Sequence, residues 1–186
     1  MFSFGYSEDA LGHGSVKSQV LPRQIEVLAQ TGRRFVAVAA GDNHALALTE
    51  EGELYGWGHE GANGHGIAEP TPRRVAALIG ERVKFLNAGP DASCAVTKNG
   101  ELFTWSRCGR YNLGHGVNIS QDTPKRVEAL AEVRVAAVAM GRWHTLVADE
   151  DGVVWAFGNR RGIWPRHSKD LCEDAHSNPR TASART

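Results

Sequence analysis

The chain of 186 residues is long enough for one domain with a hydrophobic core, and its 21 basic and 21 acidic side chains cancel to a formal net charge of zero. This balance argues against the broad basic field of a dedicated nucleic-acid-binding protein, although it leaves room for a local patch. No apolar run is long enough to predict a membrane span, and the first residues lack the basic leader and the apolar segment of a signal peptide.

The cysteines favour a reduced compartment. Cys94, Cys108 and Cys172 are an odd set without a Cys-x-x-Cys pair, so neither a disulfide framework nor a zinc knuckle is indicated. We therefore expect a cytoplasmic or nuclear protein.

The N-terminal segment begins inside a repeated unit. Its Phe2–Gly5 stretch has the aromatic pattern that returns at Tyr55–Gly58, but the strands that should precede it are absent. We expect a partial unit over residues 1–19, and then Val20–Arg34 as the outer strand and link of the first full unit.

From Val36 onward the chain repeats itself with a period of about 50 residues, which is typical of propellers and solenoids. The segments Val36–Gly58, Lys84–Ser106 and Ala136–Gly158 align without gaps. Each has one glycine, a second glycine eleven residues later and a large aromatic residue five residues after that. These positions are Gly41, Gly52 and Trp57; Gly89, Gly100 and Trp105; and Gly141, Gly152 and Phe157.

Each unit predicts antiparallel β-strands. In the first unit, His44–Thr49 alternates small and large apolar residues, and Glu53–Gly58 is short and aromatic. The intervening turn is centred on Glu51-Gly52, and the other units have Asn-Gly and Asp-Gly there, which favours two-residue type I′ hairpins.

A fourth short strand is expected near Arg73–Leu78 and Lys125–Leu130, each introduced by a Thr-Pro pair. The apolar runs are short and glycine-punctuated, which argues against helices. Four strands in about 50 residues predict one propeller blade per unit.

A glycine-rich loop follows each aromatic strand and closes on Gly-His-Gly, at Gly12–Gly14, Gly64–Gly66 and Gly114–Gly116. Together with Gly-x-x-His at Gly41–His44 and Gly141–His144, these motifs make the chain similar to the regulator-of-chromosome-condensation repeat family over about Phe2–Gly158. The resemblance implies a β-propeller, typically of seven blades; a kelch-like propeller has a similar period.

The chain departs from the family pattern in three places. Ala92 replaces the histidine of the second unit, Ser106 replaces the glycine after Trp105, and a fourth Gly-x-Gly is missing.

The predicted fold is therefore all-β, with four-stranded antiparallel propeller blades in an incomplete ring or open arc. One domain over residues 1–158 has a partial blade at 1–19 and units at about 20–66, 70–116 and 122–158. Residues 159–186 lack alternation and are rich in Arg, Ser, Asp and Pro, so they predict a disordered tail; a tail that is not native sequence is the alternative.

Three blades cannot close a ring, since propellers have four to eight. Either two chains associate to complete the propeller or the missing blades belong to a longer protein.

The histidines are candidates for ligands and for catalytic groups. His13, His65 and His115 occupy equivalent Gly-His-Gly positions, but such positions on neighbouring blades lie too far apart to share a metal. We expect ordinary loop positions, with no metal and no cofactor. His44 and His144 have no recurring nucleophile to activate, so we expect their rings to form hydrogen bonds to the backbone within or between blades.

The strand aromatics Trp57, Trp105 and Phe157 recur once per unit, which predicts packing between blades instead of a stacking platform for bases. Trp143 differs, because polar turn residues take its place in the other units. With Arg142 beside it, Trp143 is a candidate exposed anchor for a partner.

The loop Arg107–Asn112 is a second candidate contact, because it is two residues longer than its counterpart and contains Arg107, Arg110 and Tyr111. A solvated family turn is the alternative. Cys108 would be a free thiol in this loop, without an adjacent base to activate it.

These features favour a non-catalytic scaffold that presents its loops to a protein partner. The resemblance implies a wider range, because the founding member is a guanine-nucleotide exchange factor for a small nuclear GTPase and docks on chromatin, while other members are adaptors or parts of ubiquitin ligases. No exchange residue can be assigned here, and we see no insertion large enough to open a GTPase. Exchange on a Ran-like GTPase is therefore the alternative function.

Overall fold

The computed structural model describes residues 1–6, 9–14, 18–107 and 112–158. In these ranges the chain is almost entirely β and forms separate antiparallel sheets without a closed ring, as the sequence predicts. The half-blade contains β1 (Phe2–Tyr6) and β2 (Ser18–Gln24). The first blade contains β3 (Phe35–Ala40), β4 (His44–Thr49), β5 (Leu54–Gly58) and β6 (Glu69–Arg74). The second blade contains β7 (Val83–Ala88), β8 (Ala92–Thr97), β9 (Leu102–Ser106) and β10 (Gln121–Arg126). The third blade contains β11 (Val135–Met140), β12 (His144–Asp149) and β13 (Val154–Gly158).

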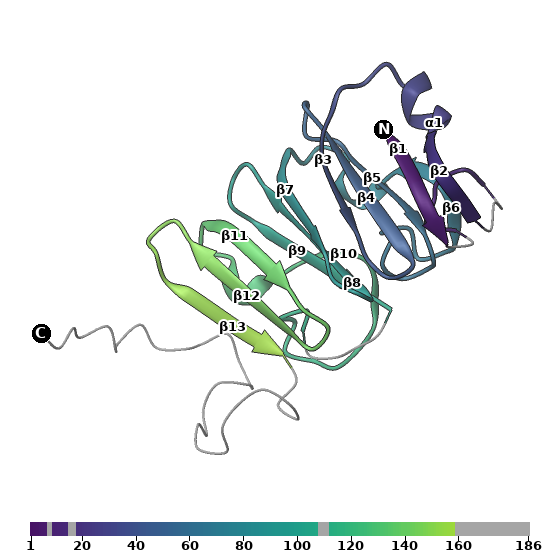
Figure 1. Ribbon diagram of the computed structural model, residues 1–186. Coiled ribbons are helices and arrows are strands. Elements are labelled where there is room, and N and C mark those ends of the chain that lie inside the picture. Colours follow the sequence, from purple (N-terminus) through teal and green to yellow (C-terminus); the bar gives the residue numbers. More distant parts are fainter. Residues whose placement is uncertain (7–8, 15–17, 108–111, 159–186) are drawn as a thin grey trace, which may run out of the picture.

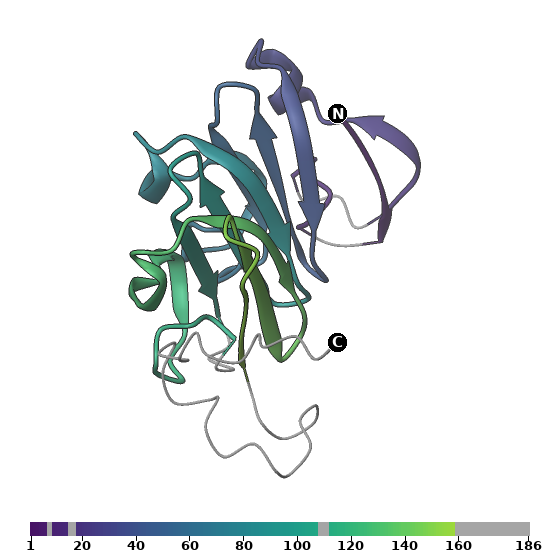
Figure 2. The ribbon, with the colours of Figure 1, turned by 90° about the vertical axis from the view of Figure 1, so that its left-hand side faces the viewer.

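The sheets follow one another in chain order and make an arc. Figure 1 shows the half-blade at one end of the row and the third blade at the other. Figure 2, turned by 90°, again places these two ends farthest apart. The innermost strands connect the blades, since β7 contacts both β3 and β4, and β11 contacts both β7 and β8.

The hairpins between the second and third strands have three-residue loops, so the predicted two-residue type I′ turns are wrong. In the second blade the Thr97 N–H donates to the Glu101 carbonyl oxygen and the Gly100 N–H donates to the Thr97 carbonyl oxygen, both at 3.0 Å. Only the last loop residue, Gly100, then needs the left-handed backbone, and its φ is +86°. The same bonds and a positive φ recur at Gly52 and Gly152.

The outer strands β6 and β10 lie about four residues earlier than predicted. They contain Pro72 and Pro124, which are tolerated because an edge strand can lack a ladder N–H. The apolar residues after them form short 3-10 helices, η1 (Ala76–Leu78) and η2 (Glu128–Leu130), and α1 (Glu26–Gln30) follows β2 in the same way. Each of these three short helices buries one leucine: Leu28, Leu78 and Leu130.

The hydrophobic core lies between successive sheets. Trp57 packs with Ile25 at the half-blade, and Trp105 of the second blade packs with Leu46 and Leu54 of the first. The aromatic residue of each third strand therefore turns toward the preceding blade, while the leucines turn toward the following blade. Phe157 packs in the same way against the cluster that contains Cys94 and Leu102 of the second blade, so the prediction of packing between blades is confirmed for Trp57, Trp105 and Phe157.

The reversal glycines after the first strands are required by space. A Cβ added to Gly41 would overlap the imidazole of His44, and a Cβ on Gly141 would lie 2.9 Å from Cε1 of His144. The Gly-x-x-His motif is therefore a packing pair in which the ring lies on the glycine.

Candidate functional site

The loops of all the blades emerge at one common edge, which we call the loop face. Successive antiparallel strands alternate in direction, so the turns at 41–43, 89–91 and 141–143 share this edge with the loops after β1, β5 and β9. The Asp42 N–H donates to the Pro90 carbonyl oxygen of the second blade at 3.0 Å, and the His59 N–H donates to the Asn43 carbonyl oxygen at 2.7 Å. The loop face is therefore one surface built from several blades.

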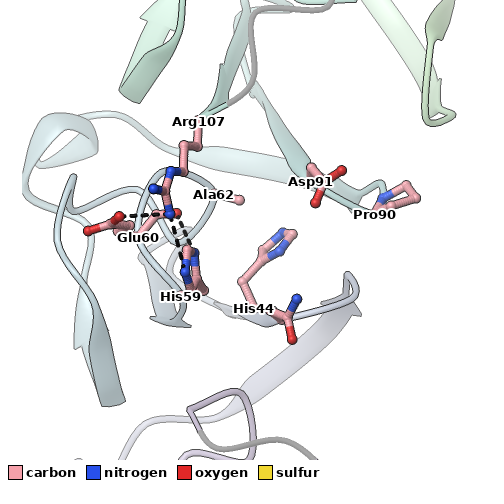
Figure 3. A pocket seen from close by; sticks show the side chains of 8 residues that line it. His44, His59, Glu60, Ala62, Pro90, Asp91 and Arg107 are labelled. Carbon is pink, nitrogen blue, oxygen red and sulfur yellow. Dashed lines mark hydrogen bonds and ion pairs between the residues drawn. The ribbon is translucent and has the colours of Figure 1, made fainter.

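A pocket of about 230 Å³ opens on the loop face between the first and second blades. Figure 3 shows His59, Glu60 and Arg107 together on one side, Asp91 on the other and His44 between them. Arg107 Nη1 lies 2.7 Å from Glu60 Oε1 and donates to His59 Nε2 at 3.3 Å. Because the Arg107 and Glu60 side chains are half-exposed, this ion pair adds little stability, but it places a guanidinium at the pocket.

His44 and Ser93 form a hydrogen bond between the first and second blades, with 2.7 Å between Nε2 and Oγ. A base and a hydroxyl at this distance are the elements of nucleophilic catalysis, but the Ser93 hydroxyl donates its proton to the Ala62 carbonyl oxygen at 2.9 Å. The histidine ring must therefore donate to Ser93. Both side chains are buried, at 2% and 0% exposure, and the hydrogen bond between them joins the first and second blades.

The protonation state of His44 fits this role. Burial lowers its pKa to about 4, and the opposing fields of Asp91 and Asp42 do not offset that effect, so the ring is neutral at pH 7. Its partner is a side chain on the next blade, so the expectation of a backbone partner is wrong for this ring. His144 Nδ1 is buried and has no hydrogen-bond partner within the described ranges.

The Gly-His-Gly histidines bond to the third strand of their own blade. His13 Nε2 lies 2.9 Å from Ser3 Oγ, and His115 Nε2 lies 3.1 Å from Thr104 Oγ1. His65 uses the equivalent position, with Nε2 at 3.0 Å from the Gly56 carbonyl oxygen. The rings therefore fix each loop to its strand, which is a more definite structural role than an ordinary loop position.

The predicted interaction residues lie in two places on the loop face. Arg107 borders the pocket, whereas Arg142 Nη2 reaches from the third blade to Asp42 Oδ2 of the first, at 3.3 Å. The neighbouring Trp143 is 43% exposed. Arg110 and Tyr111 lie outside the described residues, as do Cys108, Cys172 and residues 159–186.

Sequence reasoning missed the hydroxyls that join the blades. Ser93 bonds to Ala62 as described, and the equivalent Thr145 donates through Oγ1 to the Asn112 carbonyl oxygen at 2.7 Å. The available signal was a hydroxyl residue at this position in two of the three units, with Ala45 in the other.

The described residues also bear on three other features: a metal site, a reactive cysteine and a membrane-spanning helix. In the part of the chain that the structure describes, no group of three or more His, Cys, Asp or Glu residues could hold a metal ion. Burial raises the pKa of Cys94 to about 12, so this thiol is inert. Within the same ranges, no helix has the length and apolar character needed to cross a lipid bilayer.

Comparison with family models identifies the repeat. Two models described as "Regulator of chromosome condensation (RCC1) repeat" match, one over residues 1–48 and 99–148 and the other over residues 35–67.

Relatives agree with this match. The human "E3 ubiquitin-protein ligase HERC2" is 34% identical over 166 residues, covering 86% of this chain and 3% of the relative. The "RCC1 domain-containing protein RUG3, mitochondrial" of Arabidopsis thaliana is 32% identical over 171 residues, covering 86% and 38%. The crystal structure of Prp20p from Saccharomyces cerevisiae superimposes with a TM-score of 0.71 and 29% identity, covering 86% of this chain and 41% of that one. The chain thus spans less than half of the length of each of these proteins.

Proposed function

Because this chain belongs to the regulator of chromosome condensation (RCC1) repeat family, we propose that it is a non-catalytic scaffold whose loop face docks onto a protein partner. The observation that carries the proposal is Trp143, a large side chain left 43% exposed beside Arg142 on a face built from several blades. Tryptophan and arginine are the residues most enriched at binding hot spots, and loops on a rigid β scaffold are suited to recognition.

Several features support a protein partner. The net charge of zero disfavours a broad nucleic-acid surface, and the Ser93 hydroxyl donates its proton to the Ala62 carbonyl oxygen, so His44 does not act as its base. The pocket beside Arg107 supplies a second, polar contact on the same face. A cytoplasmic or nuclear location belongs to the proposal, although RUG3 is described as mitochondrial.

The test compares the loop face with the opposite face. The partner is first identified by affinity purification and then purified, so that its dissociation constant can be measured by calorimetry. We expect Arg142→Ala with Trp143→Ala to weaken binding roughly tenfold or more. The matched pair Ile79→Ala and Lys98→Ala, exposed on the opposite face, should leave binding unchanged. Equal weakening by both pairs, with both variants folded, would rule out docking through the loop face.

Guanine-nucleotide exchange on a small Ran-like GTPase is the second candidate. It is favoured by the similarity to Prp20p, whose structure is described together with its binding to Gsp1p and histones. The assay is release of a fluorescent guanine nucleotide from purified Gsp1p. A scaffold should leave the release rate at its intrinsic value, whereas strong acceleration at micromolar chain would put exchange first.

A further inference from the structure

The sequence contains the dipeptide Asn-Gly twice, at Asn63-Gly64 and at Asn99-Gly100. An asparagine before glycine is prone to lose its side-chain amide, because glycine has no side chain to hinder attack by its own backbone nitrogen. The reaction needs a carboxamide that can turn toward that nitrogen and water that can reach it. The two Asn-Gly sites differ in both respects.

Asn63 is held in place. It is 0% exposed. Its Nδ2 donates to the carbonyl oxygens of Gly58 and Ile67, at 2.9 and 2.7 Å, and its Oδ1 accepts the His65 N–H at 2.9 Å. Both polar atoms of the amide are therefore engaged, so the carboxamide keeps one orientation and is shielded from water.

Asn99 lies at the tip of the hairpin between β8 and β9 and is exposed. Within the described ranges its side chain has no hydrogen-bond partner. The Gly100 N–H donates to the Thr97 carbonyl oxygen at 3.0 Å, so its nitrogen becomes available when the hairpin tip opens. Such local opening requires much less free energy than unfolding of a blade. Asn99 therefore has the freedom and the access to water that Asn63 lacks.

We propose that Asn99 is a site of spontaneous deamidation and that its product loosens the contact between the second and third blades. The Gly100 backbone nitrogen loses its proton and attacks Asn99 Cγ. The new C–N bond closes a succinimide ring, the bond between Cγ and Nδ2 breaks, and Nδ2 takes up a proton and leaves as ammonia. Water then opens the ring at either of its two carbonyl carbons, which gives aspartate or isoaspartate without any oxidant or reductant.

Isoaspartate places one extra methylene group in the main chain directly before Gly100. This glycine is where the second blade meets the third, since its carbonyl oxygen accepts the Val135 N–H at 2.9 Å and a Cβ built on it would lie 2.9 Å from Arg134 Cα. The Thr97 N–H also donates to the Glu101 carbonyl oxygen at 3.0 Å across the same loop. A longer main chain cannot keep all of these distances, so either the hairpin or the contact with the third blade must give way.

The second blade alone has the reactive pair at this turn. The first blade has Glu51 before its turn glycine, and the longer side chain would have to close a larger and less favourable ring. The third blade has Asp151, whose carboxylate must be protonated before it can be attacked, which makes the reaction much slower at neutral pH. The hairpins lie at the edge opposite the loop face, so the inference does not depend on docking through that face.

The test follows the full 186-residue chain during incubation at pH 7.4 and 37 °C, with circular dichroism to verify that it stays folded. Endoproteinase Glu-C cuts after glutamate and releases residues 82–101 and 61–69, one peptide for each Asn-Gly pair. Mass spectrometry then measures the replacement of the amide NH2 by OH at each asparagine. We expect Asn99 to convert at least about tenfold faster than Asn63. In urea the two sites should convert at similar rates, because glycine follows both.

Two variants distinguish the lengthened main chain from the new charge. Asn99→Ser cannot form the succinimide, so its urea unfolding midpoint should stay the same after incubation, whereas the midpoint of the wild-type chain should fall. Asn99→Asp has the charge without the extra methylene group, and when freshly prepared it should unfold like the fresh wild-type chain. In the incubated wild-type chain the Val135 amide should exchange its hydrogen faster than before.

Equal rates at the two sites of the folded chain would overturn the proposal, as would conversion of neither site while a peptide of residues 96–103 converts. Different rates in urea would also overturn it, because the selectivity would then be a property of the local sequence. An unchanged midpoint in chains that contain isoaspartate, or an equal fall in incubated Asn99→Ser, would overturn the effect on the blade contact. None of these outcomes bears on Arg142 and Trp143, whose variants test the loop face separately.

Discussion

The interface between the first and second blades and the interface between the second and third blades use equivalent positions but different chemistry. In the first interface, His44 donates to Ser93, whose hydroxyl donates to the Ala62 carbonyl oxygen. Trp105 Nε1 donates to the same oxygen at 2.8 Å. This interface therefore depends on a connected polar network.

The second interface is simpler. Thr145 donates to the Asn112 carbonyl oxygen, and Phe157 replaces the tryptophan without offering an N–H. Ala92 of the second blade takes the place of the histidine. The Met140 side chain of the third blade lies near Gly89, the reversal glycine of the second blade, with its Cγ 3.2 Å from a Cβ built on Gly89.

The comparison teaches that one buried loop carbonyl needs a donor at each interface, while the rest of the contact can be polar or apolar. A hydroxyl serves this carbonyl in both cases, since an unpaired buried acceptor is costly. At the first interface, the His44 ring and the Trp105 indole N–H each add a hydrogen bond to this network. The second interface has neither group. The first interface should therefore respond to pH and to loss of a hydroxyl, and the second mainly to changes in packing.

The largest expected effect tests packing at the second interface. Gly100 and Gly152 have nearly the same φ, at +86° and +81°, but only Gly100 abuts the following blade, where Val135 N–H donates to its carbonyl oxygen at 2.9 Å. We expect Gly100→Val to lower the free energy of unfolding by about 3–4 kcal/mol and Gly152→Val by about 1–3 kcal/mol, the cost of backbone strain alone. Urea unfolding of both variants measures the difference, and equal losses would show that contact with the third blade adds nothing.

A pH titration should loosen the first interface selectively. The pKa of His44 is about 4 in the folded chain, and its ordinary value is 6.5, so the unfolded chain takes up a proton first as the pH falls. Stability from this group is complete above pH 6.5, declines between 6.5 and 4, and then stays constant, with a total loss on the order of 3 kcal/mol.

Hydrogen exchange at pH 7 and pH 4.5 follows this change blade by blade. Protection of β4 and β8 should fall before that of β12. His44→Ala is the control, because it removes this group, and a stability profile that stays as steep in the variant would contradict the assignment.

Loss of the bridging hydroxyl should cost more at the first interface than at the second. Ser93→Ala leaves the buried His44 ring without an acceptor, so we expect a loss of about 2 kcal/mol. Thr145→Val removes one bond and should cost about 1 kcal/mol. The double variant His44→Ala with Ser93→Ala should be less destabilised than the sum of the two single changes, because the residues share one network. Chemical denaturation of the four variants gives the coupling, and strict additivity would mean that no network exists.

The smallest effect concerns the aromatic N–H. Trp105→Phe removes one donor from a carbonyl oxygen that keeps Ser93, so the loss should be about 1 kcal/mol or less. Phe157→Trp makes the reverse change at the second interface, beside a carbonyl oxygen that already has Thr145, and should alter stability by less than about 1 kcal/mol. Thermal melts of the pair test this, and a large loss in Trp105→Phe would show that the indole, and not the hydroxyl, is the main donor.

Local patterns predicted much of each blade. The runs before and after Gly52 gave β4 and β5 because alternation and aromatic content are properties of a few adjacent residues. The outer strands were misplaced, since the apolar residues around Leu78 fit a strand as well as a short 3-10 turn. Only packing against the neighbouring blade distinguishes these two conformations.

The candidate site likewise has one feature that the sequence predicted and one that only the structure shows. Trp143 was identified from sequence because it breaks the repeat at a turn, and the structure leaves it partly exposed on the loop face. The pocket beside Arg107 had no sequence signal, because its walls come from two blades and lie about 50 residues apart along the chain.

The sequence by itself determined the repeat, and hence the blade, the packing of Trp57 and Trp105 between blades and the family. These follow from short-range rules that act in every unit: alternation, a glycine with positive φ and one aromatic residue per third strand. The tertiary structure alone decided that Ser93 receives the bond from His44 and that Arg142 reaches Asp42. The physical reason is that a hydrogen bond or an ion pair depends on distances of about 3 Å between side chains of different blades. Such distances are set by how the sheets stack, and no local pattern in the chain records them.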